Sequence, residues 1–244
     1  GSALDLSVWS PYYLPHWSSR KASAATYALD DSCLTLSIPA DQGLWCDGDH
    51  KPDLRVSGIQ SGNYSGPVGS TVGQQPYREG LVVREKQEPF WGWTPNGGYV
   101  ELPARAEISP RSMVSLWMVG LEDRPERCGE ICVMEVFGKD IRPGESAAVG
   151  MGMKQLRDPS LPQDFEFVRL PIDIADFHSY SVRWSPGEAE FAVCDVTSAD
   201  DCAALVARVV VRAGGHPFFL RELVRLGCTY IQIDAPEFGM LIDP

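Results

Sequence analysis

Residues 129–138 read Gly129-Glu130-Ile131-Cys132-Val133-Met134-Glu135-Val136-Phe137-Gly138. The aliphatic and aromatic side chains in this stretch favour an extended strand over a loop or a surface helix. Two glutamates and one cysteine are interleaved with them. The stretch therefore predicts a mostly apolar strand that carries two carboxylates.

The spacing of these acids needs an irregularity in the strand. Side chains on a regular strand alternate between its faces, so Glu130 and Cys132 point one way and Glu135 points the other way. A single bulge at Val133-Met134 would bring all three onto one face. Two carboxyl groups about 5–5.5 Å apart on one concave face form the arrangement of retaining glycosidases. The alternative is an edge strand with two solvated glutamates.

The stretch resembles the catalytic strand of family-16 glycoside hydrolases, whose bulged motif reads Glu-x-Asp-x-x-Glu. Glu130 and Glu135 match the two glutamates, and Cys132 replaces the aspartate. The resemblance implies that Glu130 is the nucleophile and Glu135 the acid/base. A neutral thiol cannot share a proton as an aspartate does, so Cys132 puts catalytic efficiency in doubt.

Further segments resemble this family in the same order along the chain. They are Ser57–Ser61, Gly98–Glu101 with Arg105, Ser115–Gly120 and Phe177–Gly187. The resemblance covers roughly residues 4–195. It implies an all-β, concanavalin A-like jelly-roll sandwich that forms one domain over residues 4–244, with a divergent, partly helical tail over residues 196–244.

The tail departs from the family pattern. Ser198 is expected to cap a helix with apolar positions at Cys202, Leu205, Val206, Val209 and Val210. A second helix is expected from Pro217 to Gly227, followed by a strand over Thr229–Asp234. Residues 222–236 resemble a piece of the cobalamin-independent methionine synthase barrel. The other reading is that Tyr230–Ile233 supplies the missing strand of the jelly roll, because a sandwich without it would expose a long edge.

Candidate sugar-contacting residues come from aromatic segments and from the family pattern. Trp91 and Trp93 in an aromatic loop are the favoured stacking residues, with anchoring of that loop as the alternative. Trp117 faces either the cleft or the core. Lys154 lies where many relatives place a histidine, and its charge beside Glu135 would favour the carboxylate and make it a poorer acid. His178 is a family feature, although a lone strand histidine more often makes structural hydrogen bonds.

The remaining segments give coarser expectations. The aromatic residues within 4–20 either wall the cleft or plug the end of the core, and residues 24–38 predict a hairpin. The loop-rich stretch from Gln42 to Pro76 is expected to line a binding cleft. Leu81–Arg84 predicts a strand. Glu122–Arg127 is a charge run typical of a solvated turn.

Composition narrows the class of partner. The chain has 244 residues and a net charge of −12, which argues against nucleic acid as a partner but not against a neutral polysaccharide or oligosaccharide. No apolar run reaches the length of a membrane span, so we expect no membrane association. We also expect a monomer. The resemblance implies no cofactor, although it leaves room for a structural calcium ion; no metal ligands are assigned.

The seven cysteines lack tandem CxxC spacing, which argues against a structural zinc site. Their odd number and apolar contexts favour reduced, buried thiols, although Cys33 and Cys46 could pair in an exported protein. The family implies an extracellular location. The cysteines and the lack of a visible signal peptide are consistent with the cytoplasm, so localisation stays open.

Three functions are consistent with the sequence. The first is a retaining endo-β-glycosidase that acts on a β-linked glucan or galactan. The second is a non-hydrolytic carbohydrate-binding protein in which Cys132 and Lys154 have impaired the acid/base machinery. The third is different small-molecule chemistry with Cys132 as nucleophile, which is disfavoured because neighbouring negative charge raises the pKa of a thiol.

Overall fold

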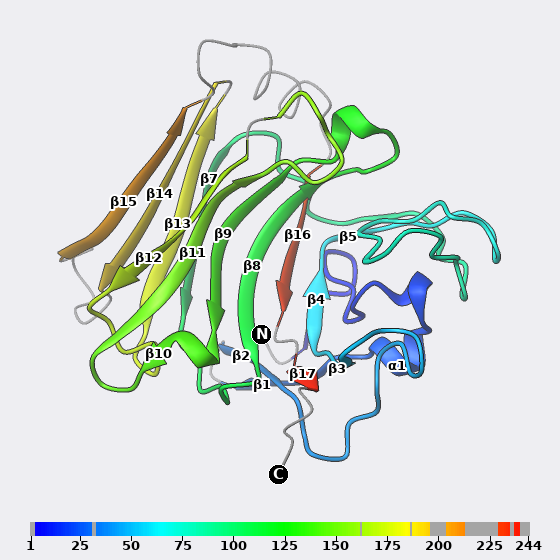
Figure 1. Ribbon diagram of the computed structural model, residues 1–244, viewed down its shortest axis with the longest axis horizontal. Helices are drawn as coiled ribbons and strands as arrows, with labels where there is room; N and C mark the ends of the chain where they lie inside the picture. Colours follow the sequence, from blue (N-terminus) through cyan, green and yellow to red (C-terminus); the bar gives the residue numbers. More distant parts are fainter. Residues whose placement is uncertain are drawn as a thin grey trace.

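The computed structural model describes residues 3–30, 33–161, 163–185, 187–195, 204–212, 229–234 and 237–239, with side chains up to residue 195. Most of the regular structure is antiparallel β-strand, and two sheets pack face to face (Figure 1). The all-β sandwich predicted from the sequence is confirmed. In the described part of the chain, no helix is long and apolar enough to cross a membrane.

The larger sheet contains seven strands and runs in the order β10, β11, β9, β8, β16 and β4, with β12 also paired to β11. Its strands are β4 (Gly58–Gln60), β8 (Met113–Gly120), β9 (Glu130–Phe137), β10 (Ile141–Arg142), β11 (Ser146–Lys154), β12 (Asp164–Leu170) and β16 (Thr229–Asp234). The strand predicted around residues 129–138 therefore lies inside a sheet, between β11 and β8, and is not an edge.

The smaller sheet has four strands in the order β15, β14, β13 and β7. These strands are β7 (Gly98–Ala104), β13 (His178–Ser185), β14 (Glu188–Asp195) and β15 (Ala204–Arg212). Alternation of side chains along β13 directs Tyr180, Val182 and Trp184 into the protein interior, where all three are buried.

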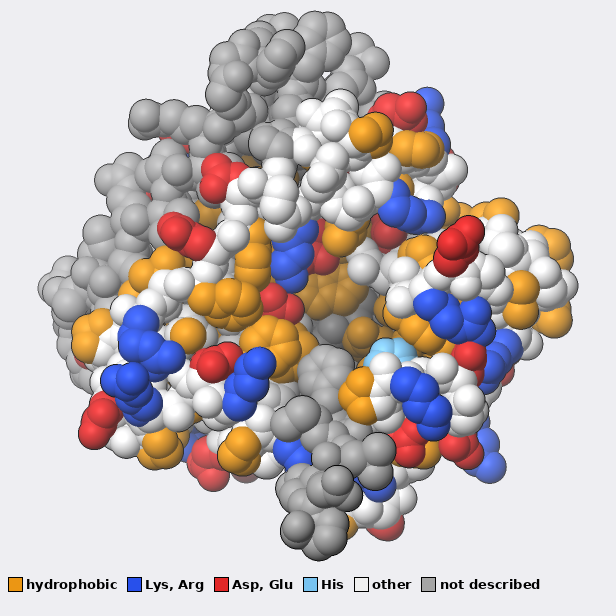
Figure 2. All heavy atoms as spheres, viewed as in Figure 1, with side chains coloured by type: hydrophobic (Ala, Val, Ile, Leu, Met, Phe, Trp, Pro, Cys, Tyr) orange, Lys and Arg blue, Asp and Glu red, His pale blue; other side chains and the backbone are white. Residues whose placement is uncertain are grey.

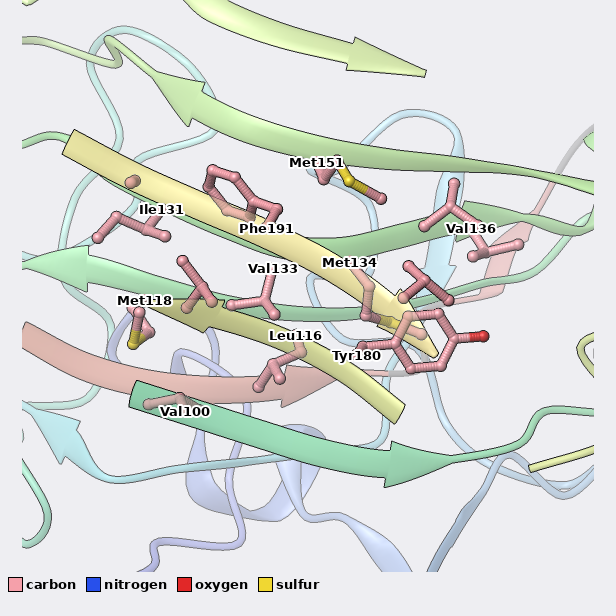
Figure 3. Packing of buried hydrophobic residues seen from close by; sticks show 14 of the residues in the cluster. Val100, Leu116, Met118, Ile131, Val133, Met134, Val136, Met151, Tyr180 and Phe191 are labelled. Carbon is pink, nitrogen blue, oxygen red and sulfur yellow. The ribbon is translucent and has the colours of Figure 1, made fainter. Parts of the chain in front are cut away.

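The main core fills the space between the two sheets. Figure 3 shows Tyr180 and Phe191 of the smaller sheet packed over apolar side chains of β8, β9 and β11. Full burial of one such side chain contributes roughly 1.5–3 kcal/mol to stability. On β9 the core-facing residues are Ile131, Val133, Met134 and Val136. Two consecutive core-facing residues, Val133 and Met134, already mark a break in the alternation of this strand.

Loops and short elements cover part of the other face of the larger sheet, called here the outer face. They include the 3-10 helix η1 (Pro15–Trp17) and the helix α1 (Arg20–Ser23). A second core cluster joins this segment to the loops that follow, with Trp17 and Trp45 at its centre. The short strands are β1 (Thr26–Asp30), β2 (Cys33–Ser37), β3 (Asp53–Arg55), β5 (Gly62–Asn63), β6 (Phe90–Trp91) and β17 (Glu237–Gly239).

The local predictions in this region had mixed outcomes. The hairpin predicted over residues 24–38 is confirmed as β1 and β2. The strand predicted at Leu81–Arg84 is wrong. Leu81 and Val83 are buried in the second cluster, but Val83 N–H bonds to the carbonyl of Ser70 in a loop and has no strand partner. Leu81 and Val83 are buried because they pack into the second core cluster, and not because they belong to a strand.

The tail is more β-rich than the sequence analysis expected. The helix predicted from Ser198 is wrong, because Ala204–Arg212 forms β15, paired with β14. Its valines favour a strand, in which branched side chains fit a pleated surface. The helix predicted from Pro217 to Gly227 lies outside the described residues. Thr229–Asp234 forms β16 between β8 and β4, so the jelly-roll reading is confirmed and the methionine synthase resemblance is not supported.

The described cysteines are free thiols. Cys46, Cys128, Cys132 and Cys194 are buried, whereas Cys33 is exposed. The pairing of Cys33 with Cys46 that the sequence left open is not formed, because the Cys46 thiol donates to the carbonyl of Trp17 at 3.3 Å. Cys202 and Cys228 lie outside the described residues.

Candidate functional site

A β-bulge in β9 brings the two glutamates to one face of the sheet. Leu116 on β8 pairs with Met134, whereas the next residue, Trp117, pairs with Cys132. Val133 is thus the extra residue, and the same irregularity appears in the pairing with β11. The bulge predicted from the odd spacing of the acids is confirmed. Glu130 and Glu135 both line one pocket on the outer face.

Lys154 connects the two carboxylates. It lies opposite Glu130 on β11, with Nζ 3.1 Å from Glu130 Oε1. The same nitrogen donates a hydrogen bond to Glu135 Oε2, also at 3.1 Å. The two oxygens are therefore at most twice that distance apart. This bound is compatible with the separation of about 5–5.5 Å between carboxyl groups that retaining glycosidases require.

Burial affects the charges of Glu130 and Lys154, which together with Glu135 are called here the trio. It raises the pKa of Glu130, and Lys154 opposes that rise. Burial also disfavours the charge on Lys154, but Glu130, Cys132 and Glu135 outweigh it, so the pKa of Lys154 is raised. The ammonium group is thus held in its charged form by the groups around it. One positive charge serves two carboxylates, so a single proton on the pair would make the trio neutral.

Cys132 lies on the same side of β9 but is fully buried, with no exposed surface. Burial and the charge of Glu130 raise the pKa of its thiol well above the ordinary value. Only the thiolate is a good nucleophile. The site therefore does not favour the third function, in which Cys132 attacks a small molecule.

The pocket has a volume of about 230 Å³ and is walled by aromatic side chains opposite the acids. Trp45 packs against Tyr77 and Tyr13 with ring centroids 5.3 and 5.1 Å apart. The residues that line the pocket are Tyr13, Leu14, Trp45, His50, Leu54, Gln75, Pro76, Tyr77, Met113, Ser115, Trp117, Glu130, Glu135 and Lys154. In Figure 2, hydrophobic side chains surround charged ones in the hollow at the centre of this face.

Four buried polar atoms on residues that line the pocket have no hydrogen-bond partner within the described residues. They are Trp45 Nε1, Gln75 Nε2, Ser115 Oγ and Glu130 Oε1, the last of which is ion-paired with Lys154. Ser115 lies beside Glu135 across the β8–β9 pair. Unsatisfied buried polar atoms are costly, which suits a site where a ligand's hydroxyl groups would complete the bonding.

The wall of the pocket is anchored by a buried carboxyl group. Glu122 Oε2 accepts a hydrogen bond from the backbone N–H of Gln75 at 2.9 Å, and Arg157 lies 3.2 Å from Glu122 Oε1. The Glu122 side chain is only 1% exposed, so the solvated turn predicted at residues 122–127 is wrong at its first residue. Burial raises the pKa of Glu122 to about 8, although Arg157 opposes the rise.

Only some of the sugar-contacting residues predicted from the sequence line the pocket. Trp117 and Lys154 line the pocket. Trp91 and Trp93 do not; they pack on Tyr64 and Trp9, with ring centroids 5.9 and 6.3 Å apart. Trp91 and Trp93 are 38% and 41% exposed, and their stacking on a sugar stays a prediction.

His178 lies in the smaller sheet, away from the pocket. It is buried, and its Nε2 donates to the carbonyl oxygen of Asp173 at 2.9 Å. This hydrogen bond fits the structural role weighed in the sequence analysis, and a role of His178 in substrate binding stays a prediction.

Sequence reasoning did not single out three residues of the aromatic wall: Trp45, His50 and Tyr77. The signal that could have found Trp45 and His50 was the stretch from Gln42 to Pro76, which was expected to line a cleft and does supply pocket residues. Their loops have no periodicity, so the individual positions could not be assigned. The N-terminal aromatics serve both proposed roles, since Tyr13 walls the pocket and Trp17 is core.

Among the described residues, no three His, Cys, Asp or Glu side chains are grouped as metal ligands. A structural calcium ion, which the sequence analysis allowed, therefore has no such group of side-chain ligands in the described part of the chain.

Comparison with known proteins finds similar folds at low sequence identity. No protein-family model and no curated protein sequence matches this chain. The GlcNAcα1-4Gal-releasing endo-β-galactosidase from Clostridium perfringens matches 97% of the chain with a TM-score of 0.68 and 20% identity. This chain spans only about half, 54%, of that protein chain.

Two glucanases have a similar architecture. The laminarinase catalytic domain from Thermotoga maritima matches 98% of this chain and 84% of its own, at a TM-score of 0.52 and 17% identity. A non-specific endo-β-1,3(4)-glucanase from family GH16 matches 98% of this chain and 77% of its own, at 0.52 and 14% identity. The chain therefore has a jelly-roll fold like that of these endo-β-glycosidases.

Proposed function

We propose that this protein is a retaining endo-β-glycosidase that acts on a β-linked glucan or galactan. One observation carries the proposal: the bulge at Val133 turns Glu130 and Glu135 into a single pocket, where one lysine nitrogen is 3.1 Å from an oxygen of each. The similar folds named above, which include an endo-β-galactosidase and glucanases, support the choice of substrate class.

In the first step, Glu130 attacks the anomeric carbon and forms an ester bond with it. The glycosidic C–O bond breaks, and a protonated Glu135 gives its proton to the leaving oxygen. In the second step, Glu135 accepts a proton from water while the water oxygen bonds to the anomeric carbon. Glu130 leaves as a carboxylate, and the two inversions retain the configuration.

The pocket has features that suit a sugar ring. Aromatic faces of Trp45, Tyr77 and Trp117 offer apolar surface for the C–H face of a pyranose. Ser115 Oγ, which has no hydrogen-bond partner among the described residues, offers a polar atom for one of its hydroxyl groups. Such a combination of apolar walls and a few convergent polar groups is typical of small-ligand sites.

The charges in the site also favour a second candidate, a carbohydrate-binding protein that does not hydrolyse its ligand. Catalysis needs an ionised Glu130 and a protonated Glu135. Burial raises the pKa of Glu130, which favours the protonated form of the proposed nucleophile, although Lys154 opposes the rise. Cys132 also replaces the residue that shares charge with the nucleophile in the resembling family.

The test is hydrolysis of β-1,3-glucan, mixed-linkage glucan and β-galactan by the parent protein, Glu130→Gln and Glu135→Gln. Glu166→Gln on β12 is the matched control, because Glu166 is exposed and does not line the pocket. We expect product with retained anomeric configuration from the parent and the control only. Equal activity of Glu130→Gln and the parent would remove the proposed nucleophile.

The second candidate has its own signature. It predicts oligosaccharide binding by the parent protein, measured by calorimetry, without product release from any of the three polysaccharides. Loss of that binding in Tyr77→Ala, with the fold retained by circular dichroism, would assign the binding to this pocket, because Tyr77 lines it and is only half-buried.

A further inference from the structure

Three phenylalanines form an apolar surface beside the pocket that the proposed mechanism does not use. They are Phe137 on β9 and Phe165 and Phe167 on β12, called here the phenylalanine platform. The ring centroids of Phe137 and Phe167 are 5.9 Å apart, and those of Phe165 and Phe167 are 5.2 Å apart. Phe167 is 47% exposed, so the ring at the centre of this cluster is accessible to a ligand.

Two glycines on β11 give the rings their position. Phe165 pairs with Gly152 and Phe167 pairs with Gly150. A Cβ atom on Gly150 would lie 2.6 Å from Phe165 and 2.8 Å from Phe167, so both rings lie over this glycine. On its other side, Gly150 pairs with Glu135. The rings therefore extend across β11 toward the strand that carries the carboxylates.

The platform borders the catalytic trio directly. Lys154 Nζ lies 4.5 Å from the ring centroid of Phe165, and the same nitrogen contacts both Glu130 and Glu135. Phe137 is on the same face as Glu135, two residues further along β9 after the bulge. The apolar surface thus begins where the pocket ends.

The platform and the aromatic wall lie on opposite sides of the acids. Figure 1 shows β12 on one side of β9, and β8 with the loops around β3 and β4 on the other. The wall residue Trp45 comes from the loop before β3, and Tyr77 comes from the loop between β5 and β6. A linear ligand that passes over Glu130 and Glu135 would therefore meet aromatic surface on both sides.

We propose that the phenylalanine platform is a second sugar subsite, which binds the apolar C–H face of a pyranose in the same β-linked chain that occupies the pocket. This inference rests on the proposed function. Phenylalanine has no polar atom, so the platform suits the C–H face of a ring and not its hydroxyl edge. Continuity with the carboxylate site makes a neighbouring sugar of the same chain the occupant. The acids then lie between two subsites, as internal cleavage or internal binding of a chain requires.

The experiment uses Glu130→Gln as the background, so that ligands stay intact. Calorimetry measures the Kd of laminari-oligosaccharides and β-1,4-galacto-oligosaccharides of two and of six sugar units. Phe167→Ala is added to this background, with Phe177→Ala as the matched control. Phe177 is similarly exposed, at 44%, but precedes β13 of the smaller sheet and stacks with Arg105.

We expect Phe167→Ala to weaken the binding of the six-unit ligand about tenfold, which corresponds to about 1.4 kcal/mol, and to leave the two-unit ligand unchanged. Phe177→Ala should change neither. Equal Kd values for the six-unit ligand in Phe167→Ala and Phe177→Ala would overturn the subsite while leaving the proposed function intact. No binding of any ligand by the Glu130→Gln background would overturn both proposals.

Two further outcomes decide between occupants. Concentration-dependent dimerisation in sedimentation that Phe167→Ala abolishes would assign the platform to a second copy of the chain and overturn the subsite. Equal weakening of the two-unit and six-unit ligands by Phe167→Ala would place the platform within the pocket's own subsite, and would also overturn the proposal.

Discussion

Lys154 lies directly opposite Glu130 on the adjacent strand, and its Nζ is 3.1 Å from Glu130 Oε1. This ion pair is largely shielded from water, because the two side chains are 22% and 7% exposed. The same nitrogen bonds to Glu135, so one side chain balances the charge of both proposed catalytic groups. The stability and the chemistry of the site therefore both depend on Lys154.

We expect Lys154→Met to destabilise the protein by about 3 kcal/mol at pH 8, because buried carboxylates lose their counter-charge. The loss should be smaller at pH 5.5, since the buried Glu130, whose pKa is already raised, can take up a proton. Urea unfolding at the two pH values measures this. Lys139→Met, an exposed lysine that stacks on Phe137, is the control. Equal losses at both pH values would contradict the charge argument.

Cys132→Asp tests whether the site is a weakened enzyme. An aspartate beside Glu130 can share a proton and accept a hydrogen bond, which the buried thiol cannot. We expect the hydrolysis rate on the best substrate to rise about tenfold or more, at some cost in thermal stability. Cys132→Ser controls for the loss of sulfur. No gain in rate from Cys132→Asp, with ligand binding retained, favours the non-hydrolytic function.

The buried Glu122 predicts a pH-dependent stability. Its pKa is about 8 in the folded protein, well above the 4.5 of an ordinary glutamate. Between these values the folded state binds more protons than the unfolded state, so the free energy of unfolding falls as pH rises toward 8.

His16 is another buried group with a large shift, and burial lowers its pKa to about 4, so it is neutral in both states above about pH 7. The raised pKa values of Glu130 and of the buried thiols of Cys128 and Cys132 also affect stability between pH 7 and pH 9. The difference between the urea-unfolding profiles of the parent protein and Glu122→Gln in this range therefore isolates Glu122. We expect Glu122→Gln to flatten the profile in this range, and an unchanged slope would refute the assignment.

We expect an alanine substitution to cost more stability at Gly152 than at Gly150. Gly152 has a φ of +131°, and an added Cβ would lie 2.2 Å from the backbone oxygen of Asp164. Gly152→Ala should therefore cost at least about 2 kcal/mol. At Gly150 the added Cβ would meet only phenylalanine rings, which can turn aside. Thermal unfolding of both variants checks this, and an equal loss of stability would show that the rings cannot move.

The sequence by itself determined some strands of the sandwich but not all, because it predicted a helix where Ala204–Arg212 forms β15. The apolar residues of Glu130–Phe137 are a local property, and this segment is a strand in the structure. The odd spacing of Glu130 and Glu135 was enough to predict a bulge at Val133-Met134. Alternation repeats every two residues, so two acids five residues apart lie on opposite faces unless one extra residue intervenes, and this is visible without any tertiary information.

Only the tertiary structure decided which side chains surround the acids. Trp91 and Trp45 are both tryptophans in irregular segments, yet Trp91 packs on Tyr64 and Trp45 walls the pocket. Glu122 reads as part of a solvated charge run but is buried against Gln75 and Arg157. The position of a loop depends on contacts between residues far apart in the chain. No local periodicity records those contacts, and so the sequence could not assign the walls of the pocket.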